Sequence, residues 1–329
     1  MRRPSPLRLR GLCRWAARAG LVWACVSCAP KPERDASIVR DLRVLALAAD
    51  LPGQLVPQGP PDEAHPLYTF AAAPAGREMR ALVVDPRAPL APVRFSAWAC
   101  LAAHQPCDLE DSRTRVLVRD AVGTPEILTF DADFSAADLN TWVAEDPYRG
   151  YDRLSVRIEL FVEGFEGAQA RAQTVVTFRA PEFLRNADRG IWEPRQAFEN
   201  PKDVFVVPAE VSPRTAINLL EDRTWDLPPG GTLFMALLGD YVFVDVAYTL
   251  PTGEQRYPRR SIRSHAEVVS LYTVSGRVSP PVFVATEPDG FGYVAPSRAR
   301  FTAPDVLYIV VHDDSGGCAW ARWTMRRSP

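Results

Sequence analysis

The sequence predicts an all-β fold: two immunoglobulin-like β-sandwiches in tandem, with one short helix in the first. Many short segments alternate apolar and polar residues, which is typical of half-buried strands. Proline, which breaks helices, is abundant, with 31 Pro against 19 Gly. A length of 329 residues allows about two domains. The composition, 47% hydrophobic and 24% charged, excludes a disordered chain, and no apolar run reaches the roughly 20 residues of a spanning helix.

Residues 1–27 are predicted to be a secretory signal peptide. They contain six arginines and no acidic residue, and the apolar stretch 19–27 is too short to span a bilayer. Its removal leaves 302 residues (329 − 27) and takes the formal net charge from −2 to −8 (−2 − 6). The mature protein is therefore acidic, which disfavours a nucleic-acid partner.

The signal ends in a pattern that resembles a bacterial lipobox, in which a small residue precedes a lipidated cysteine. Ser27 precedes Cys28, although Cys25 stands three positions earlier, where Leu is usual. The second choice is a lipobox that ends at Cys25, in which Trp23 would be an unusual residue. The third is a secreted protein without a lipid anchor, whose signal peptide is cleaved near the same point. We favour Cys28 because a polar, proline-containing segment, residues 30–34, follows it as a tether.

The lipobox resemblance implies a diacylglycerol on the sulfur of Cys28 and an acylated amino end. Several acyl chains anchor a protein far better than one. Residue 29 is Ala, not the Asp that usually signals retention in the inner membrane, so the resemblance implies the outer membrane, on its periplasmic face or at the cell surface.

The strand predictions come from period-two alternation between turn residues. The clearest segment is 154–163, where five apolar residues alternate with Ser, Arg, Glu, Phe and Glu; the turn 164–167 then predicts a hairpin with 169–178. The other expected strands are 43–49, 79–85, 92–100, 114–118, 204–207, 232–237, 242–250, 268–274, 282–285, 306–312 and 319–325.

One helix is expected after Ser135, which suits an N-cap, with Asp138 at the third helical position. Leu139 and Trp142 would share a face that covers one end of the first sandwich. The same segment has partial calcium-loop spacing, in Asp131, Asp133, Ser135 and Asp138. We favour the helix cap because Ala136 and Trp142 occupy the positions where such a loop needs Gly and Glu.

The domain prediction places the signal peptide at 1–27, a lipidated N-terminus and tether at 28–39, the first sandwich at 40–181, a linker at 182–202 and the second sandwich at 203–329. The linker is rich in Pro and charge without periodicity. A loose repeat of residues 51–55 in 227–233 is consistent with two units of one plan.

Six cysteines are encoded, and three of them belong to the predicted body: Cys100, Cys107 and Cys318. In an oxidising compartment we expect Cys100 and Cys107, seven positions apart, to pair. Cys318 is then left as a small buried residue. No Cys/His cluster has zinc spacing, and no cofactor is expected.

A serine hydrolase is the sharpest enzymatic hypothesis. The segment Asp314-Ser315-Gly316-Gly317 resembles the nucleophile motif of trypsin-like enzymes, and Ala102-Ala103-His104 resembles their histidine motif. Only 14 residues follow Ser315, too few for the strands that such a fold needs there. We therefore interpret 313–317 as a turn between the last two strands, with Asp313 and Asp314 as weak cation candidates.

Two further segments carry a family resemblance. The opening Arg43-Val44-Leu45-Ala46-Leu47, followed by a Pro-Gly turn, and the ending Asp313-Asp314-Ser315-Gly316-Gly317 resemble uncharacterised myxobacterial-type lipoproteins. The ending is also similar to the last hairpin of PKD- and immunoglobulin-like domains. The resemblance implies no activity.

The functional prediction is a lipid-anchored cell-envelope protein that acts as a non-catalytic binding or structural module, not an enzyme. Its expected partners are the membrane and an unknown envelope protein or glycan, and its oligomeric state is left open. The alternative is a surface carbohydrate-binding or adhesion protein, which needs exposed aromatic residues; the candidates are Trp192, Trp225, Trp320 and Trp323. A hydrolase that uses Ser315 ranks third.

Overall fold

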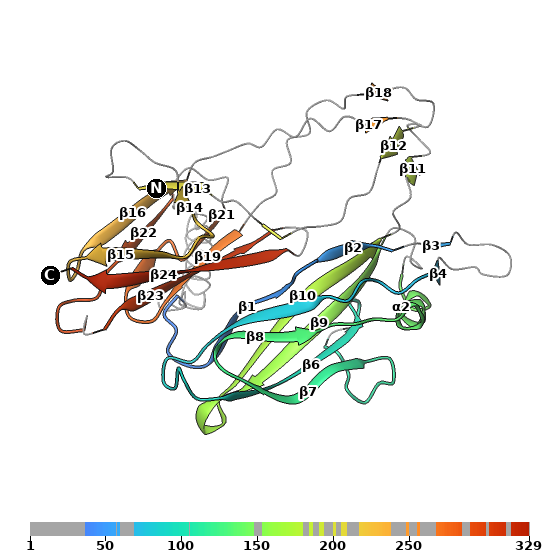
Figure 1. Ribbon diagram of the computed structural model, residues 1–329, viewed down its shortest axis with the longest axis horizontal. Helices are drawn as coiled ribbons and strands as arrows, with labels where there is room; N and C mark the ends of the chain where they lie inside the picture. The colour runs from blue at the N-terminus through green and yellow to red at the C-terminus, as the bar shows by residue number, and fades with distance from the viewer. Residues whose placement is uncertain are drawn as a thin grey trace, which may run out of the picture. The chain divides into compact units, whose positions relative to one another are not determined.

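Two β-sandwiches form the body of the protein in the computed structural model (Figure 1). The structure describes residues 37–56, 58–59, 69–104, 106–147, 153–179, 184–186, 191–193, 200–201, 205–208, 217–237, 248–249, 255–256, 268–284, 290–300, 303–313 and 317–328. The predicted fold class is confirmed: all-β, with one short α-helix, in the first sandwich, among these residues.

The first sandwich has the strand order of an immunoglobulin-like fold. One sheet has the order β1-β5-β8 and the other β2-β10-β9-β6-β7, which correspond to strands A-B-E and A′-G-F-C-C′. Only the β2–β10 pair is parallel. The strands are β1 (Arg43–Ala49), β2 (Gly53–Leu55), β5 (Glu78–Val84), β6 (Val93–Leu101), β7 (Arg115–Gly123), β8 (Glu126–Asp131), β9 (Leu154–Glu163) and β10 (Gln169–Arg179).

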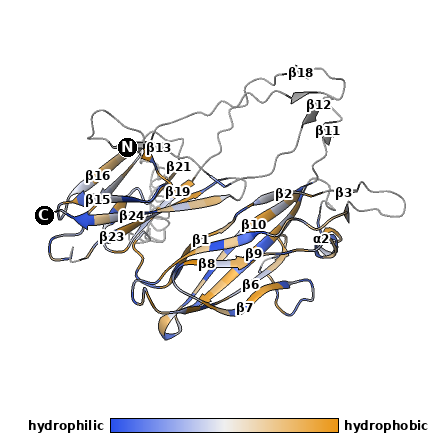
Figure 2. Ribbon diagram, viewed as in Figure 1, coloured by the Kyte–Doolittle hydropathy of each residue, from blue (hydrophilic) through white to orange (hydrophobic). Residues whose placement is uncertain are grey.

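Alternation along β9 determines which residues form the first core. Its five apolar residues from Leu154 to Val162 are all buried, whereas the residues between them lie on the outer face of the sheet. In Figure 2 the strands of this sandwich carry both apolar and polar colours, as strands with one buried face do. A single core therefore fills the space between the two sheets.

Helix α2 (Ala136–Val143) closes one end of this sandwich, as predicted. The Ser135 side chain accepts a hydrogen bond from the Asp138 N–H, and the Asp138 carboxylate accepts one from the Ser135 N–H, so the capping box is complete. Leu139, Trp142 and Val143 are buried in the core. The helix-cap interpretation, favoured over the calcium loop, is therefore confirmed for Ser135 and Asp138.

The second sandwich repeats the plan. Its sheets have the orders β14-β13-β16-β22-β20 and β15-β24-β23-β19-β21, and the parallel β15–β24 pair takes the place of β2–β10. The strands are β13 (Phe205–Pro208), β14 (Ile217–Asn218), β15 (Arg223–Leu227), β16 (Thr232–Leu237), β19 (Val268–Thr273), β20 (Arg277–Ser279), β21 (Val282–Val284), β22 (Phe291–Val294), β23 (Asp305–His312) and β24 (Cys318–Arg327).

Three two-stranded pairs complete the described elements: β3 (Gln58–Gly59) with β4 (Thr69–Phe70), β11 (Leu184–Asn186) with β12 (Ile191–Glu193), and β17 (Tyr248–Thr249) with β18 (Gln255–Arg256). A single-turn 3₁₀ helix, Phe165–Gly167, makes the β9–β10 turn. Of the strand predicted at 242–250, only β17 lies within the described residues.

A buried carboxylate organises the core of the second sandwich. Asp305 Oδ2 accepts hydrogen bonds from the Tyr293 hydroxyl (2.7 Å), the Thr273 hydroxyl (2.7 Å) and the Gly276 N–H (2.6 Å). Its Oδ1 accepts a fourth bond, from the Ser275 N–H at 2.9 Å. Burial is the main cause of a Tyr293 pKa well above its usual value, and the nearby Asp305 charge raises this pKa further. Gly276 must remain glycine, because a Cβ there would lie 2.5 Å from the Tyr293 ring.

The chain enters the first sandwich by way of a strand of the second. The Thr273 N–H donates to the Ser37 carbonyl and the Val39 N–H donates to the Thr273 carbonyl, both at 2.8 Å. Asn200 also bonds to both sandwiches, through the Ala49 carbonyl at 2.7 Å and the Cys318 N–H at 3.0 Å. Cys318 is a free, buried cysteine, as expected from its sequence context.

Candidate functional site

A disulfide-bonded loop connects β6 to β7 at the helix end of the first sandwich. Cys100, next to last in β6, is bonded to Cys107 in the loop, with the Cα atoms 5.7 Å apart. The predicted disulfide is therefore confirmed. The His104 N–H donates to the Leu101 carbonyl at 2.9 Å and makes the first turn of the loop. We refer to residues 102–114 as the C–C′ loop.

Glu159 of β9 fastens this loop to the outer face of the five-stranded sheet. Its carboxylate accepts hydrogen bonds from the Trp98 indole N–H at 3.2 Å and from the Cys107 N–H at 3.1 Å. Trp98, Cys100 and Cys107 form a small buried cluster, against which Phe161 packs. The cluster lies outside the main core, so the disulfide holds the loop across an otherwise polar face.

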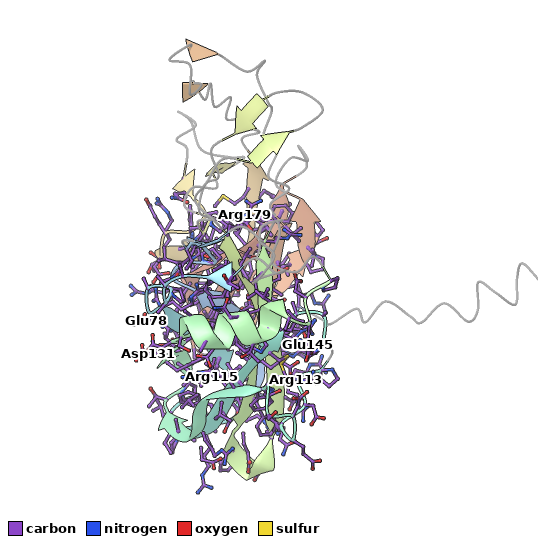
Figure 3. The ribbon with its side chains drawn as sticks, turned by 90° about the vertical axis from the view of Figure 1, so that its right-hand side faces the viewer. Glu78, Arg113, Arg115, Asp131, Glu145 and Arg179 are labelled. Carbon is purple, nitrogen blue, oxygen red and sulfur yellow. A yellow bond between two sulfur atoms is a disulfide. The ribbon has the colours of Figure 1, made fainter. Side chains whose placement is uncertain are left out.

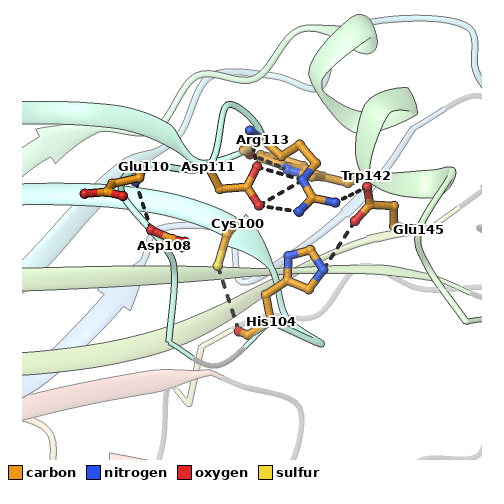
Figure 4. A network of polar contacts seen from close by, with 8 residues as sticks. All are labelled: Cys100, His104, Asp108, Glu110, Asp111, Arg113, Trp142 and Glu145. Carbon is orange, nitrogen blue, oxygen red and sulfur yellow. Dashed lines mark hydrogen bonds and ion pairs between the residues drawn. The ribbon is translucent and has the colours of Figure 1, made fainter.

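Charged side chains fasten the other half of the loop to the helix end (Figure 4). The Arg113 guanidinium pairs with both carboxylate oxygens of Asp111 and with Glu145, just beyond α2. The Trp142 indole donates to the Arg113 carbonyl at 2.9 Å. The hydrogen bonds from Arg113 lower the Asp111 pKa to about 2, so this carboxylate is ionised over the physiological range. Figure 3 looks onto α2 at this end, with Arg113, Arg115 and Glu145 labelled around it.

His104, the base of the hypothetical hydrolase, has an acidic partner in this loop. Its Nε2 lies 3.3 Å from a carboxylate oxygen of Glu145. Ser315 and Asp314 lie outside the described residues. The residues that flank them close the β23–β24 turn of the second sandwich: the Gly317 N–H donates to Asp313 Oδ1 at 2.7 Å. A carboxylate oxygen of the cation candidate Asp313 is thus used by the turn itself.

The remaining candidates are placed as follows. Among the described residues, no group of three or more His, Cys, Asp or Glu side chains is arranged to hold a metal ion. Cys25 and Cys28, the lipidation candidates, lie outside the described residues. Trp192 is in β12, where it pairs with Arg185 of β11. The Trp225 and Trp323 rings pack 5.7 Å apart in the second sandwich, and Trp320 is partly covered by Arg80.

Sequence reasoning missed the residues that fix the loop: Glu159, Glu145 and Arg113. Alternation assigns Glu159 to the outer face of β9, but it does not reveal that a loop more than 50 positions earlier folds over that face. Leu109, at the exposed part of the C–C′ loop, is 59% exposed. The loop therefore combines a fixed backbone with an apolar side chain that is open to solvent.

A second exposed feature lies on the outer face of the second sandwich. The Phe234 side chain of β16 is 50% exposed and lies over Gly292 of β22, where a Cβ would be 3.1 Å from the ring. The neighbouring Val294 is also exposed. An exposed aromatic ring on a sheet face is the feature that the carbohydrate-binding alternative requires.

No protein-family model and no curated protein matches the chain. The D0-D1 domain of intimin overlaps 86% of this chain and 98% of its own, with 10% identity and a TM-score of 0.18. A Salmonella alpha-2-macroglobulin mutant overlaps 85% of this chain and 16% of its own (8% identity, TM-score 0.22). Trypsin-activated alpha-2-macroglobulin from Escherichia coli overlaps 88% and 17% (8% identity, TM-score 0.19). These TM-scores are too low to support any argument about function.

Among the described residues, no helix combines the length and the apolar content that crossing a bilayer requires.

Proposed function

We propose that the protein is a lipid-anchored cell-envelope protein that acts as a non-catalytic binding module through its C–C′ loop. The observation that carries the proposal is the way this loop is held. The disulfide, Glu159, Glu145 and the Asp111–Arg113 pair fix it, while Leu109 stays exposed. A loop that is already ordered loses little entropy on binding, and binding residues are commonly presented on loops by a rigid scaffold.

Site-specific photo-crosslinking in intact cells tests the binding proposal. A photoreactive phenylalanine analogue replaces Leu109, and the matched control replaces Val282, an exposed valine of the second sandwich. We expect a discrete crosslinked species at position 109 that is absent at position 282. Its yield should fall when Cys100 and Cys107 are both changed to Ser. Equal crosslinking at both positions would overturn the assignment of the binding surface.

Lipidation at Cys28 is a separate part of the proposal. It is supported by the lipobox-like Ser27-Cys28 pair and the polar segment after it. Labelling with radioactive palmitate should be lost in Cys28→Ala and retained in Cys25→Ala. Unchanged labelling in Cys28→Ala would reject this site, and loss only in Cys25→Ala would support the second choice.

Residence in the outer membrane follows from Ala29 under the common sorting rule. Membrane fractionation should find the wild type with the outer membrane, and Ala29→Asp should shift it to the inner membrane. The same distribution for both proteins would contradict the sorting argument.

A second candidate function, carbohydrate binding, is favoured by the exposed Phe234 ring over Gly292. Aromatic faces offer an apolar surface on which sugar rings can pack. A glycan array should then show binding that Phe234→Ala abolishes and Val282→Ala leaves intact. Absence of any glycan signal for the wild type would remove this candidate.

A further inference from the structure

One edge of the five-stranded sheet is open along most of its length. β2 pairs with β10 only at residues 177–179 of β10. Among the described residues, no strand pairs with the earlier part of that edge, residues 169–176. β1 lies beside β10 there but belongs to the other sheet, in which it pairs with β5 (Figure 1). The last strand of the first sandwich therefore has a free side.

The hydrogen bonds of β10 show which backbone groups face this free side. The Thr177 N–H donates to the Pro52 carbonyl at 2.8 Å, so Thr177 directs its backbone groups away from β9. The pairing of β10 with β9 has no bulge, and backbone groups alternate between the two sides of an antiparallel strand. Arg171, Gln173 and Val175 therefore also direct their N–H and C=O groups to the free side. Among the described residues, none of these groups has a backbone partner.

A groove of about 430 Å³ lies along the same stretch. Residues 171–175 of β10 and 44–47 of β1 line it, together with His312, Asp313 and Gly317 of the β23–β24 turn. Its volume is within the range of pockets that bind small ligands. The unpaired backbone groups of β10 thus face a confined space that can take one further strand.

The side chains of β10 define what such a strand should carry. Ala170 and Ala172 pack against the core, and their small size leaves room for apolar side chains on the inner face. Arg171 is exposed on the outer face, with its guanidinium 5.4 Å from the centre of the Phe161 ring, and it has no carboxylate partner among the described residues. Residues that lie opposite each other on paired strands share a face, and opposite charges there are stabilising. The complementary strand therefore alternates apolar residues with acidic ones.

We propose that this groove binds an extended segment of a partner protein, which adds to the sheet as a strand beside β10. The segment has about five residues, to match the stretch 171–175, and runs antiparallel to β10, the more stable direction of pairing. Its acidic residues lie opposite Arg171 and Gln173, and its apolar residues lie over Ala172. This surface is separate from the C–C′ loop, and the inference does not depend on the lipid anchor.

Two other occupants suit the groove less well. The chain before Ser37 contains Pro30 and Pro32, which lack the N–H that a strand donates. A second copy of the protein would have to bring the edge of a whole sandwich between β1 and the β23–β24 turn, which both line the groove.

The probe is a fluorescein-labelled peptide, Thr-Val-Glu-Val-Glu-Val-Thr, and the measurement is its fluorescence anisotropy with the full-length mature protein. We expect saturable binding. In the antiparallel pairing the glutamate N–H groups face β10 and the valine N–H groups face away. N-methylation of both glutamates should therefore weaken binding by about tenfold or more, whereas N-methylation of the two valines that precede them should change it by less than about twofold.

Two variants of the protein test the same pairing from the other side. Gln173→Pro removes an N–H that faces the groove and leaves the hydrogen bonds to β9 in place, so it should weaken binding by about tenfold. Gln173→Ala, the matched control, loses the side chain but keeps the N–H, and should bind like the wild type. Arg171→Glu should weaken binding of the glutamate peptide and favour a peptide with lysine at both glutamate positions. Unfolding midpoints show whether each variant is folded.

Several results would overturn the proposal. These are the absence of saturable binding at peptide concentrations up to about 1 mM, equal effects of the two N-methylation patterns, and equal losses in Gln173→Ala and Gln173→Pro. If Gln173→Pro does not fold, the two N-methylated peptides decide the question alone. Self-association of the wild type that Gln173→Pro abolishes would identify a second copy as the occupant, and would also overturn the proposal.

Discussion

Replacement of Asp305 by Ala removes a buried carboxylate from the core of the second sandwich. The carboxylate is buried and accepts four hydrogen bonds, two from hydroxyl groups and two from backbone N–H groups. Alanine removes the shared acceptor from all four donors at once, although the Gly276 N–H keeps a second acceptor, Thr273 Oγ1 at 3.2 Å. The methyl group of Ala also leaves part of the space empty.

The magnitude follows from the number of donors left behind. A buried donor without a partner costs about 1–3 kcal/mol. The four costs are not additive, because the donors share one acceptor and can relax together. A hydrogen bond to a charged group contributes about 1.5–3 kcal/mol, so with partial additivity we expect Asp305→Ala to lower the free energy of unfolding by about 4 kcal/mol. Asp305→Asn keeps the shape and one acceptor oxygen, and should fall between Ala and the wild type.

Urea unfolding of the second sandwich provides the assay. Fluorescence reports on the buried Trp323, which packs against Trp225 in the same core. With a slope of about 2 kcal/mol per molar urea, a loss of about 4 kcal/mol moves the midpoint down by about 2 M. A loss below about 1 kcal/mol for Asp305→Ala would refute the reasoning, because the four bonds would then contribute almost nothing net. An Asn variant less stable than the Ala variant would also contradict it.

Three further outcomes are expected. The wild type should lose stability as the pH rises above about 10, the ordinary tyrosine pKa, because the raised Tyr293 pKa keeps the folded phenol protonated while the unfolded one ionises. In a pH series of unfolding midpoints, Tyr293→Phe should be less stable than the wild type at neutral pH and should show a smaller decline above about pH 10. An unchanged decline in Tyr293→Phe would disprove the assignment to Tyr293. The double change of Cys100 and Cys107 to Ser should cost about 2 kcal/mol in thermal or urea unfolding of the first sandwich under oxidising conditions, and reductant should then have no further effect. Ser135→Ala should cost about 1 kcal/mol, whereas Ser135→Asp, which can still cap α2, should stay close to the wild type.

Three strands, β1, β9 and β16, were predicted with the bounds that the structure has. In β9 and β16 buried residues alternate with more exposed ones, as in a strand with one buried face, whereas in β1 the residues Leu45–Ala49 are all buried. Of the described sandwich strands, six were not predicted: β2, β8, β14, β15, β20 and β22. Each has six residues or fewer, and β2 and β22 contain glycine. β15 is stabilised by a parallel partner, β24, almost a hundred residues later, which no local pattern reveals.

The loose internal repeat illustrates the same limit. The two sandwiches do share a strand order, with a parallel A′–G pair in each. The repeated residues are not equivalent, however: 53–55 form β2, whereas 227–233 cover the end of β15, a turn and the start of β16. The shared plan comes from sheet topology, and the Pro-Gly resemblance between the segments reflects the common use of these residues in turns.

Only the covalent part of the candidate site could be predicted from the sequence. The pairing of Cys100 with Cys107 follows from their spacing and the expected compartment. The partners that hold the loop come from β9 and from the end of α2, which are brought close only by the fold. A polar residue on the outer face of a strand looks the same in sequence whether it faces solvent, as Glu163 does, or fastens a loop, as Glu159 does.

Thr273 connects the core of the second sandwich to the point where the chain enters the body. Its backbone pairs with Ser37 and Val39, and its hydroxyl donates to Asp305. The same residue therefore belongs both to the bridge with Ile38 and to the buried carboxylate network. Because a buried, hydrogen-bonded acceptor holds Thr273 in place, Ser37 and Val39, which bond to its backbone, are held in turn by the core of the second sandwich.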